Sequence, residues 1–320
     1  LMKDPSSKIK EDDFFEGLWG AARKDGVVYG VPVDNNPIIL WVNKKVLKEA
    51  GITEMPWELQ EKGEWTWDAF VGMIEKIRAN NKYGYVLDNA WTHYYSWISS
   101  NGGQVYNDEG KFIAHENEKA IEAFRFLNDN VKKGNFTFSS TLPKGQGGDA
   151  MFMSNQVAFV GAGRWYLPVF KQNKDLEYDI VPFPTNTGNK IEPAAIATAY
   201  MVLNKDSKNK DKAYEFLAEF VSKEGQIFRL QGGGNAVPSI AGADEVVMEG
   251  NLPEHAQYFL DARAIGFALT PFEAGVPGLS SEITSELEGL WLKNGDLDAT
   301  LKTVGEKANK KIEEYRAGQK

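Results

Sequence analysis

The chain of 320 residues contains no cysteine, which excludes disulfide scaffolds, thiolate metal sites and cysteine nucleophiles. It has only three histidines, His93, His115 and His255, and they are scattered along the sequence. Neither an HExxH zinc motif nor a GxSxG nucleophile elbow is present. We therefore expect no metal site, no cofactor and no enzymatic activity of these familiar kinds.

The chain has fewer basic than acidic residues, 36 Lys and Arg compared with 45 Asp and Glu, which gives a net charge of −9. Nucleic acids and anionic membrane surfaces bind basic patches, so neither is expected as a partner. No run approaches the ~18 apolar residues of a membrane span. The opening residues, LMKDPSSKIKEDDFF, lack the apolar centre of a signal peptide. A hydrophobic content of 42% and a length sufficient for two domains are typical of a globular protein.

The most informative stretch is residues 25–51 (DGVVYGVPVDNNPIILWVNKKVLKEAG). A turn at Asp25-Gly26 leads into a strand, and Pro32 and Pro37 bracket the polar residues 34–36. An apolar strand follows over 38–42, and then a helix over 44–50 that Asn43 can cap. This pattern indicates a strand crossing between two lobes, with acceptor-rich side chains where the lobes meet. A surface loop between two strands is an equally open interpretation.

A second informative stretch follows the buried strand predicted over 157–160, where Gly161, Gly163, Arg164 and Trp165 precede a helix start. Small residues at the carboxyl end of a strand are typical of ligand positions in α/β proteins. A Trp face can cover a sugar ring. Arg164 could bind a ligand hydroxyl or close a salt bridge.

Aromatic residues are also dense over 91–97 (WTHYYSW), more than one buried helix face needs. Some of them should face a cavity or the other lobe, with core packing as the alternative. The remaining elements read as ordinary helices and strands. Helical spacing is seen over 14–22, 66–77, 117–133, 150–155, 210–221, 226–230, 252–265, 282–293 and 297–315, and strands are expected at 83–87 and 178–184. Residues 52–65 read as a loop under which Trp65 and Trp67 pack, with ligand contact as the alternative. Thr66 can cap the helix that follows this loop.

Several segments, taken in order, resemble the extracellular solute-binding proteins of bacterial ABC importers, in the sugar-binding group that includes maltose-binding protein. The resemblance covers nearly all of the chain. It is carried by the Gly–x–Pro strand with Asn43-Lys44 after it, and by residues 65–70 (WTWDAF), 101–103 (NGG), 163–165 (GRW) and 232–238 (GGGNAVP). On this resemblance roughly a hundred residues, about a domain's worth, would precede the first lobe as it stands here.

The resemblance implies an α/β fold of two lobes with a ligand cleft between them. Three crossovers near residues 34–39, 192–199 and 267–274 would join the lobes. The first lobe would comprise residues 1–36 and 197–270, and the second residues 37–196 and 271–320. Closure of the lobes about these crossovers would be a hinge motion selected by ligand.

It also implies the function and the site. The chain would capture a mono- or oligosaccharide as a monomer outside the cytoplasm, in the periplasm or as a lipoprotein, and deliver it to a membrane permease. A sugar would stack on Trp165 and on either Trp91 or Tyr94. Asp34, Asn36 and Asn235 would bind hydroxyls, with Gly163 and Arg164 beside them. Residues 275–279 lack the aromatic that the family often carries there, which indicates a sugar unlike a maltodextrin in size or shape.

Two other classes stay open. A carbohydrate-active enzyme could use the same aromatic cleft, provided that two carboxylates flank the sugar. The other class is a binding protein for a peptide, a polyamine or a metal chelate. A cleft with several acids and few aromatics would favour a cationic ligand.

Overall fold

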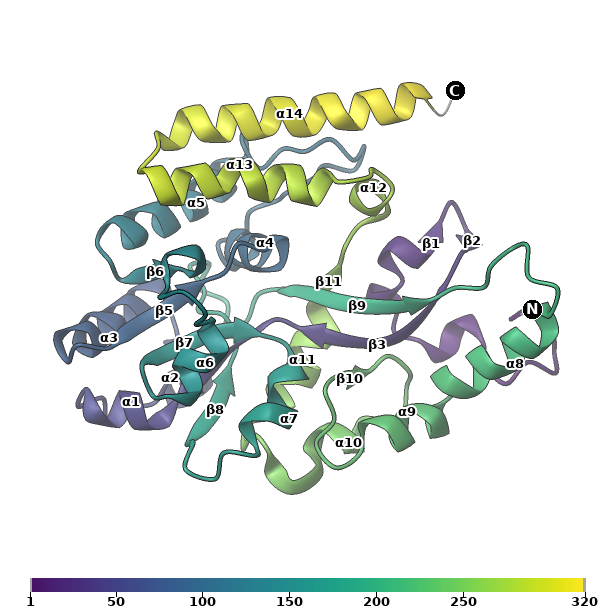
Figure 1. Cartoon of the computed structure of the whole chain (residues 1–320), viewed down its shortest axis with the longest axis horizontal. Helices are drawn as coiled ribbons and strands as arrows, with labels where there is room; N and C mark the ends of the chain where they lie inside the picture. The colour runs from purple at the N-terminus through teal and green to yellow at the C-terminus, as the bar shows by residue number, and fades with distance from the viewer. Residues whose placement is uncertain (1, 319–320) are drawn as a thin grey trace.

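The computed structural model describes residues 2–318, and two separate β-sheets organise them (Figure 1). The first sheet has the strand order β10 (Val237–Pro238), β3 (Val31–Pro37), β9 (Ala195–Met201) and β11 (Phe267–Ala268). The second has the order β6 (Phe136–Phe138), β5 (Tyr83–Leu87), β7 (Val157–Ala162), β4 (Ile39–Asn43) and β8 (Tyr178–Val181). A small ribbon of β1 (Arg23–Lys24) and β2 (Val27–Val28) lies beside the first sheet.

The predicted crossing strand is present, because β3 of the first sheet is followed after Ile38 by β4 of the second. The sequence pattern had suggested that the polar residues 34–36 form the connection between these strands, and this prediction was wrong. They belong to β3 and pair with β9 on one side, and Asp34 and Asn35 also pair with β10 on the other. The pairing register shifts between Pro32 and Asp34, so the missing N–H of Pro32 falls beside a bulge, where a sheet tolerates it.

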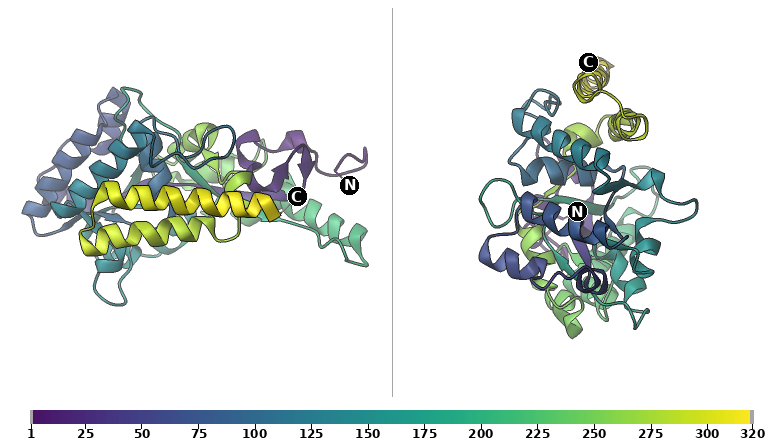
Figure 2. Two further views of the ribbon diagram at one scale, coloured as in Figure 1. Left: turned by 90° about the horizontal axis from the view of Figure 1, so that it is seen from above. Right: turned by 90° about the vertical axis from the view of Figure 1, so that its left-hand side faces the viewer.

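The chain returns to the first sheet at β9 and leaves it again after β11. The short helix α12 (Pro271–Ala274) then leads to α13 (Leu279–Lys293) and α14 (Leu297–Gly318). These two long helices lie side by side along the second sheet's helical layer, next to α4 (Trp91–Ser100) and α5 (Glu118–Lys132) (Figure 2). The end of the chain thus belongs with the second sheet.

Side-chain caps fix where several helices begin. The Asn43 side chain accepts the N–H of Val46 at the start of α1 (Lys44–Glu49), and Thr66 accepts the N–H of Ala69 at α3 (Trp67–Ala79). Asn117 caps α5 in the same way. The caps at Asn43 and Thr66 were visible in the sequence, because a cap depends on residues only three apart.

Further helices surround the sheets. They are α2 (Pro56–Lys62), α6 (Gly148–Met153), α7 (Leu167–Phe170), α8 (Lys210–Val221), α9 (Lys223–Leu230), α10 (Glu245–Met248) and α11 (Gln257–Ile265). Two predictions about helices and loops were also wrong. The loop expected over 52–65 contains α2, which begins at Pro56. The helix expected over 14–22 is a pair of 3₁₀ turns, Glu16–Leu18 and Gly20–Ala22.

Aromatic side chains fill the core around the second sheet, where Trp65 and Trp67 are buried as predicted. A second apolar cluster joins the two sheets on one side. In it the Trp41 ring of β4 lies 5.9 Å from the Phe259 ring of α11, the helix that leads into β11 of the first sheet. None of the described helices combines the length and apolarity needed to cross a lipid bilayer.

Candidate functional site

A hollow of about 520 Å³ lies where the two sheets meet. Four of the predicted site residues line it: Asp34 and Asn36 from β3, Trp91 from the start of α4, and Trp165 from the turn after β7. Ala21, residues 196–200 of β9 and Leu269 complete the lining. Strand residues of the first sheet therefore meet residues from the turn and helix beside the second sheet in one cavity.

Two polar side chains and two alanines occupy neighbouring positions on the strands at this hollow. Asp34 and Asn36 are two residues apart, so they point to the same face of β3. Their partners across the ladder are Ala199 and Ala197. Because cross-strand partners share a face, methyl groups stand beside the polar side chains and leave room above the sheet.

The carboxylate of Asp34 is held on one side. Its Oδ2 accepts a hydrogen bond from Nη1 of Arg229 at 3.1 Å, and Nη2 of the same guanidinium donates to the carbonyl of Val33 at 3.1 Å. The guanidinium also lies 4.3 Å from the ring centroid of Phe220. Among the described residues only Arg229 binds this carboxylate. The carboxylate of Asp34 is therefore oriented and still has lone pairs that can accept hydrogen bonds from a ligand.

Asn36 and Gly163 position the neighbouring Trp165. Oδ1 of Asn36 accepts the backbone N–H of Arg164 at 2.8 Å, which leaves its amide group as a donor. A Cβ on Gly163 would lie 2.3 Å from the Trp165 ring and 2.5 Å from Cβ of Asn36. The ring therefore packs directly over a residue that has no side chain, while 36% of Trp165 stays exposed.

The two aromatic candidates on α4, Trp91 and Tyr94, differ in their surroundings. Trp91 is partly buried and lines the hollow. Tyr94 is fully buried, donates its hydroxyl to Asn89 Oδ1 at 2.8 Å, and accepts from the indole N–H of Trp291 at 2.9 Å. Tyr94 is thus a satisfied core residue, and its ring is not accessible to a ligand here.

Arg164 and Asn235 also lie outside the lining of the hollow. Arg164 is fully buried and donates to the carbonyls of Ala236 and Val246, both at 3.0 Å. Burial lowers the pKa of its guanidinium to about 10, so it keeps its charge at neutral pH. Asn235 is exposed on the turn before β10. Arg164 therefore ties the two sheets together instead of meeting a hydroxyl.

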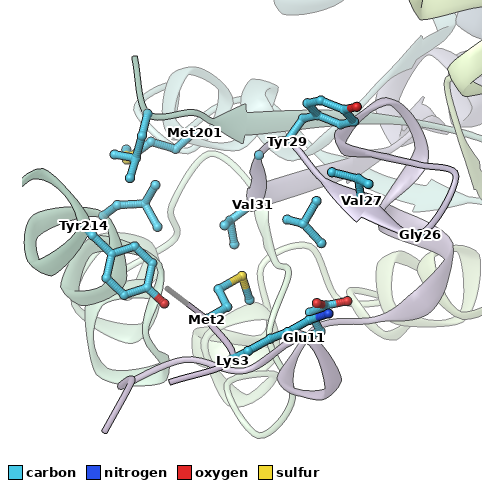
Figure 3. A pocket seen from close by; sticks show the side chains of 13 residues that line it. Met2, Lys3, Glu11, Gly26, Val27, Tyr29, Val31, Met201 and Tyr214 are labelled. Atoms are coloured by element: carbon cyan, nitrogen blue, oxygen red, sulfur yellow. The ribbon is translucent and has the colours of Figure 1, made fainter. Parts of the chain in front are cut away.

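A hollow of about 530 Å³ is found elsewhere on the first sheet (Figure 3). It contains none of the predicted site residues. Apolar side chains dominate its walls: Val27, Tyr29, Val31, Met201 and Leu203 contribute, together with Met2, Val28 and Leu217. It offers few groups that could orient a polar ligand.

One group of side chains has the composition of a metal site: Asp179, Glu254 and His255. The ammonium of Lys44 already lies 3.1 Å from Asp179 Oδ2 and 3.0 Å from Glu254 Oε2. A charged side chain therefore stands beside both carboxylates, where a cation would bind. This cluster is better described as a network of ion pairs.

Known proteins resemble the chain in sequence. Residues 3–227 match the family model of bacterial extracellular solute-binding proteins. The maltodextrin-binding protein MdxE of Bacillus subtilis is 27% identical over 238 residues, 67% of this chain and 51% of MdxE. The diacetylchitobiose binding protein DasA of Streptomyces coelicolor is 25% identical over 315 residues, 92% of this chain and 68% of DasA. The chain spans about half the length of MdxE.

Solved structures agree on the fold. An ABC substrate-binding protein of Listeria monocytogenes, in complex with cycloalternan, superposes with a TM-score of 0.82 at 18% identity, over 97% of this chain and 78% of the other. At that identity the match establishes the two-lobe fold alone. The family model covers more than two thirds of the sequence, and the chain therefore belongs to the bacterial extracellular solute-binding proteins.

Proposed function

We propose that the chain is the substrate-binding component of a bacterial ABC importer and captures a carbohydrate in the hollow between its sheets. The observation that carries the proposal is the pairing, in one cavity, of two Trp side chains with Asp34 and Asn36. A sugar has an apolar ring face that an indole can cover, and hydroxyls that each need a partner when buried. An oriented carboxylate and a free amide suit adjacent hydroxyls.

The division into lobes is part of the proposal. We assign residues 1–36 and 197–270 to the first lobe, and 37–196 and 271–320 to the second. Asp34 and Asn36 then stand in the first lobe, and Trp91 and Trp165 in the second. A ligand that touches all four would favour closure, and the hinge would lie at the crossovers, beginning at Pro37 and Ile38. Asn235, on the same loop as β10, would reach ligand only after such a motion.

The same proposal includes the setting. As a monomer outside the cytoplasm, in the periplasm or anchored as a lipoprotein, the closed form would deliver sugar to a membrane permease. The named relatives are binding proteins for maltodextrin and diacetylchitobiose. Their names support a carbohydrate as ligand without identifying which one.

Binding is favoured over catalysis by the carboxylates of the site. A glycosidase needs two of them flanking the sugar, roughly 5–9.5 Å apart. Asp34 is the one acidic side chain among the described residues that line the hollow, and Arg229 already pairs with it. This composition also supports a neutral ligand over a polyamine, which would attract several acids.

A thermal-shift screen of the chain tests the proposal. The panel holds neutral mono- and oligosaccharides, with amino acids, peptides and polyamines as controls. A ligand that binds only the folded state stabilises it by about 2.7 kcal/mol at a hundred times its Kd. We expect one class of saccharide to raise the melting temperature and to be recovered intact by mass spectrometry. Cleaved sugar would point to an enzyme, and a response to control ligands alone would refute the carbohydrate assignment.

A further inference from the structure

A second, smaller cavity of about 210 Å³ adjoins the sugar site, and Trp91 and Leu269 line both. Its walls come from α4, from the loop that follows it, and from β11 and α12. The lining includes two phenols and one carboxyl group, which belong to Tyr95, Tyr106 and Glu273.

Glu273 is a buried acid, with 2% of its surface exposed. The hydroxyl of Tyr95 lies 3.0 Å from each of its carboxylate oxygens, and the hydroxyl of Ser280 donates to Oε1 at 2.6 Å. No Lys, Arg or His lines the cavity, and none of the salt bridges within residues 2–318 includes Glu273. Hydroxyls thus stabilise this carboxylate, but no positive charge from the described part of the chain neutralises it.

A buried charge without a partner is costly, so the site has to be balanced in some way. Burial raises the pKa of Glu273, and the hydroxyl hydrogen bonds offset this only in part. A proton can therefore neutralise the carboxyl. A cation that enters the cavity would do the same while leaving the carboxylate ionised.

Aromatic rings form the rest of the cavity wall. The rings of Trp91 and Tyr95 are 5.4 Å apart and inclined by 62°, and those of Tyr95 and Tyr106 are 6.4 Å apart and inclined by 80°. Steeply inclined neighbours form a corner instead of a flat stack. Aromatic faces attract cations, and walls of this kind recognise alkylated ammonium groups.

We propose that this cavity binds an organic cation of the alkylated ammonium type, with Glu273 as its counter-ion and the three rings around it. A bare metal ion would need several oxygen ligands, and a primary ammonium three acceptors, whereas the lining is mostly apolar. An alkylated ammonium needs only charge balance and apolar contact. The inference goes beyond carbohydrate capture and does not depend on it.

The test uses choline chloride as the cation and 3,3-dimethyl-1-butanol as its neutral counterpart of the same shape. Melting temperatures are measured for the wild type, E273Q and D34N, with sodium chloride matched to the choline salt. We expect choline to raise the melting temperature of the wild type and of D34N, and the neutral alcohol to do so far less. In E273Q the apparent affinity for choline should fall at least about tenfold.

A second variant keeps the test decisive if E273Q folds poorly. Y106L removes one aromatic wall and leaves the carboxylate in place, and it should weaken the choline response in the same direction. The proposal is overturned if choline leaves the wild type unchanged, if the alcohol gives an equal shift, or if both variants respond like the wild type. The neutral saccharide screen reports on the other cavity, so the two proposals fail separately.

Discussion

The buried carboxylate of Asp179 accepts two hydrogen bonds from His255, one from the backbone N–H at 3.1 Å and one from ring Nδ1 at 2.9 Å. Asp179 lies on β8 of the second sheet, and His255 lies just before α11, which leads into the first sheet. Lys44 joins the same group and bridges Asp179 to Glu254. The pair therefore links β8 of the second sheet to the segment that leads into β11 of the first sheet.

We expect D179A to lower the free energy of unfolding by about 3 kcal/mol, because it removes a buried charge from partners that stay in place. The matched control is K48A, since Lys48 pairs with Glu177 at the surface, with 57% and 51% of the side chains exposed. Exposed pairs contribute less than about 1 kcal/mol. Urea denaturation of both variants gives the comparison, and equal losses would show that the Asp179 network is not a stabilising link.

The W165A variant tests the aromatic part of the proposed sugar site. If a sugar ring lies on the indole, its loss should weaken saccharide binding at least about tenfold, or about 1.4 kcal/mol, in a calorimetric titration. F228A is the matched control, because Phe228 is 77% exposed and does not line the hollow. Unchanged affinity in W165A, or an equal loss in F228A, would remove the stacking assignment.

The G163A variant tests how the indole is positioned. The backbone at Gly163 has φ −80°, which any residue adopts, so the new methyl group acts through space alone. It would overlap both the Trp165 ring and Asn36, and overpacking of this kind costs about 1–3 kcal/mol. We expect weaker saccharide binding by a protein that still folds.

The control for G163A is G72A, at an open position within α3. Alanine there should raise stability by about 0.5–1 kcal/mol and leave saccharide affinity unchanged. Urea denaturation and calorimetric titration of both variants check the pair. If G163A bound saccharide as well as G72A, the contact between Gly163 and the indole would have no part in binding.

Short-range features were the ones that the sequence could predict. Asn43 and Thr66 act on residues three positions away, and Gly163 and Trp165 follow a strand end, so local pattern was sufficient. The helix expected over 14–22 failed for a local reason too. Gly20 takes a positive φ of 32° within that stretch, which interrupts a right-handed helix.

Contacts between residues far apart in the chain could not be predicted from the sequence. Trp91 and Tyr94 are both aromatic and one helical turn apart, and Tyr94 is covered by residues distant in sequence, Phe124 on α5 and Trp291 on α13. Arg229 meets Asp34 across 195 positions, and nothing near either residue signals the pair. The carbonyls that hold Arg164 likewise lie far along the chain, at Ala236 before β10 and at Val246 on α10. Site composition was therefore predictable where one segment supplies it, and not where two segments meet.

Stability should depend on pH through Glu273. Because burial raises its pKa, the folded protein holds this proton at pH values where the unfolded chain has released it. The contribution of Glu273 to the free energy of unfolding is therefore fully present below the pKa of the unfolded chain, about 4.5. It is lost as the pH rises through the pKa of Glu273 in the folded protein. The side chain of E273Q is neutral at every pH and loses no such contribution. The free energy of unfolding of E273Q should therefore increase relative to that of the wild type as the pH rises.

Urea denaturation of the wild type and E273Q between about pH 4 and pH 8 measures the difference, in which the other acids cancel. Tyr95 and Tyr106 are the titratable groups that act on Glu273, and both keep their protons over this range because burial raises the pKa of each.

E116Q is a control for which the pH dependence of stability should have the opposite sign. The hydrogen bond from Lys111 lowers the pKa of the exposed Glu116, so its contribution is lost as pH falls. A difference between wild type and E273Q that stayed flat with pH would mean that Glu273 keeps the same charge folded and unfolded, and that the cavity does not hold an unbalanced carboxyl.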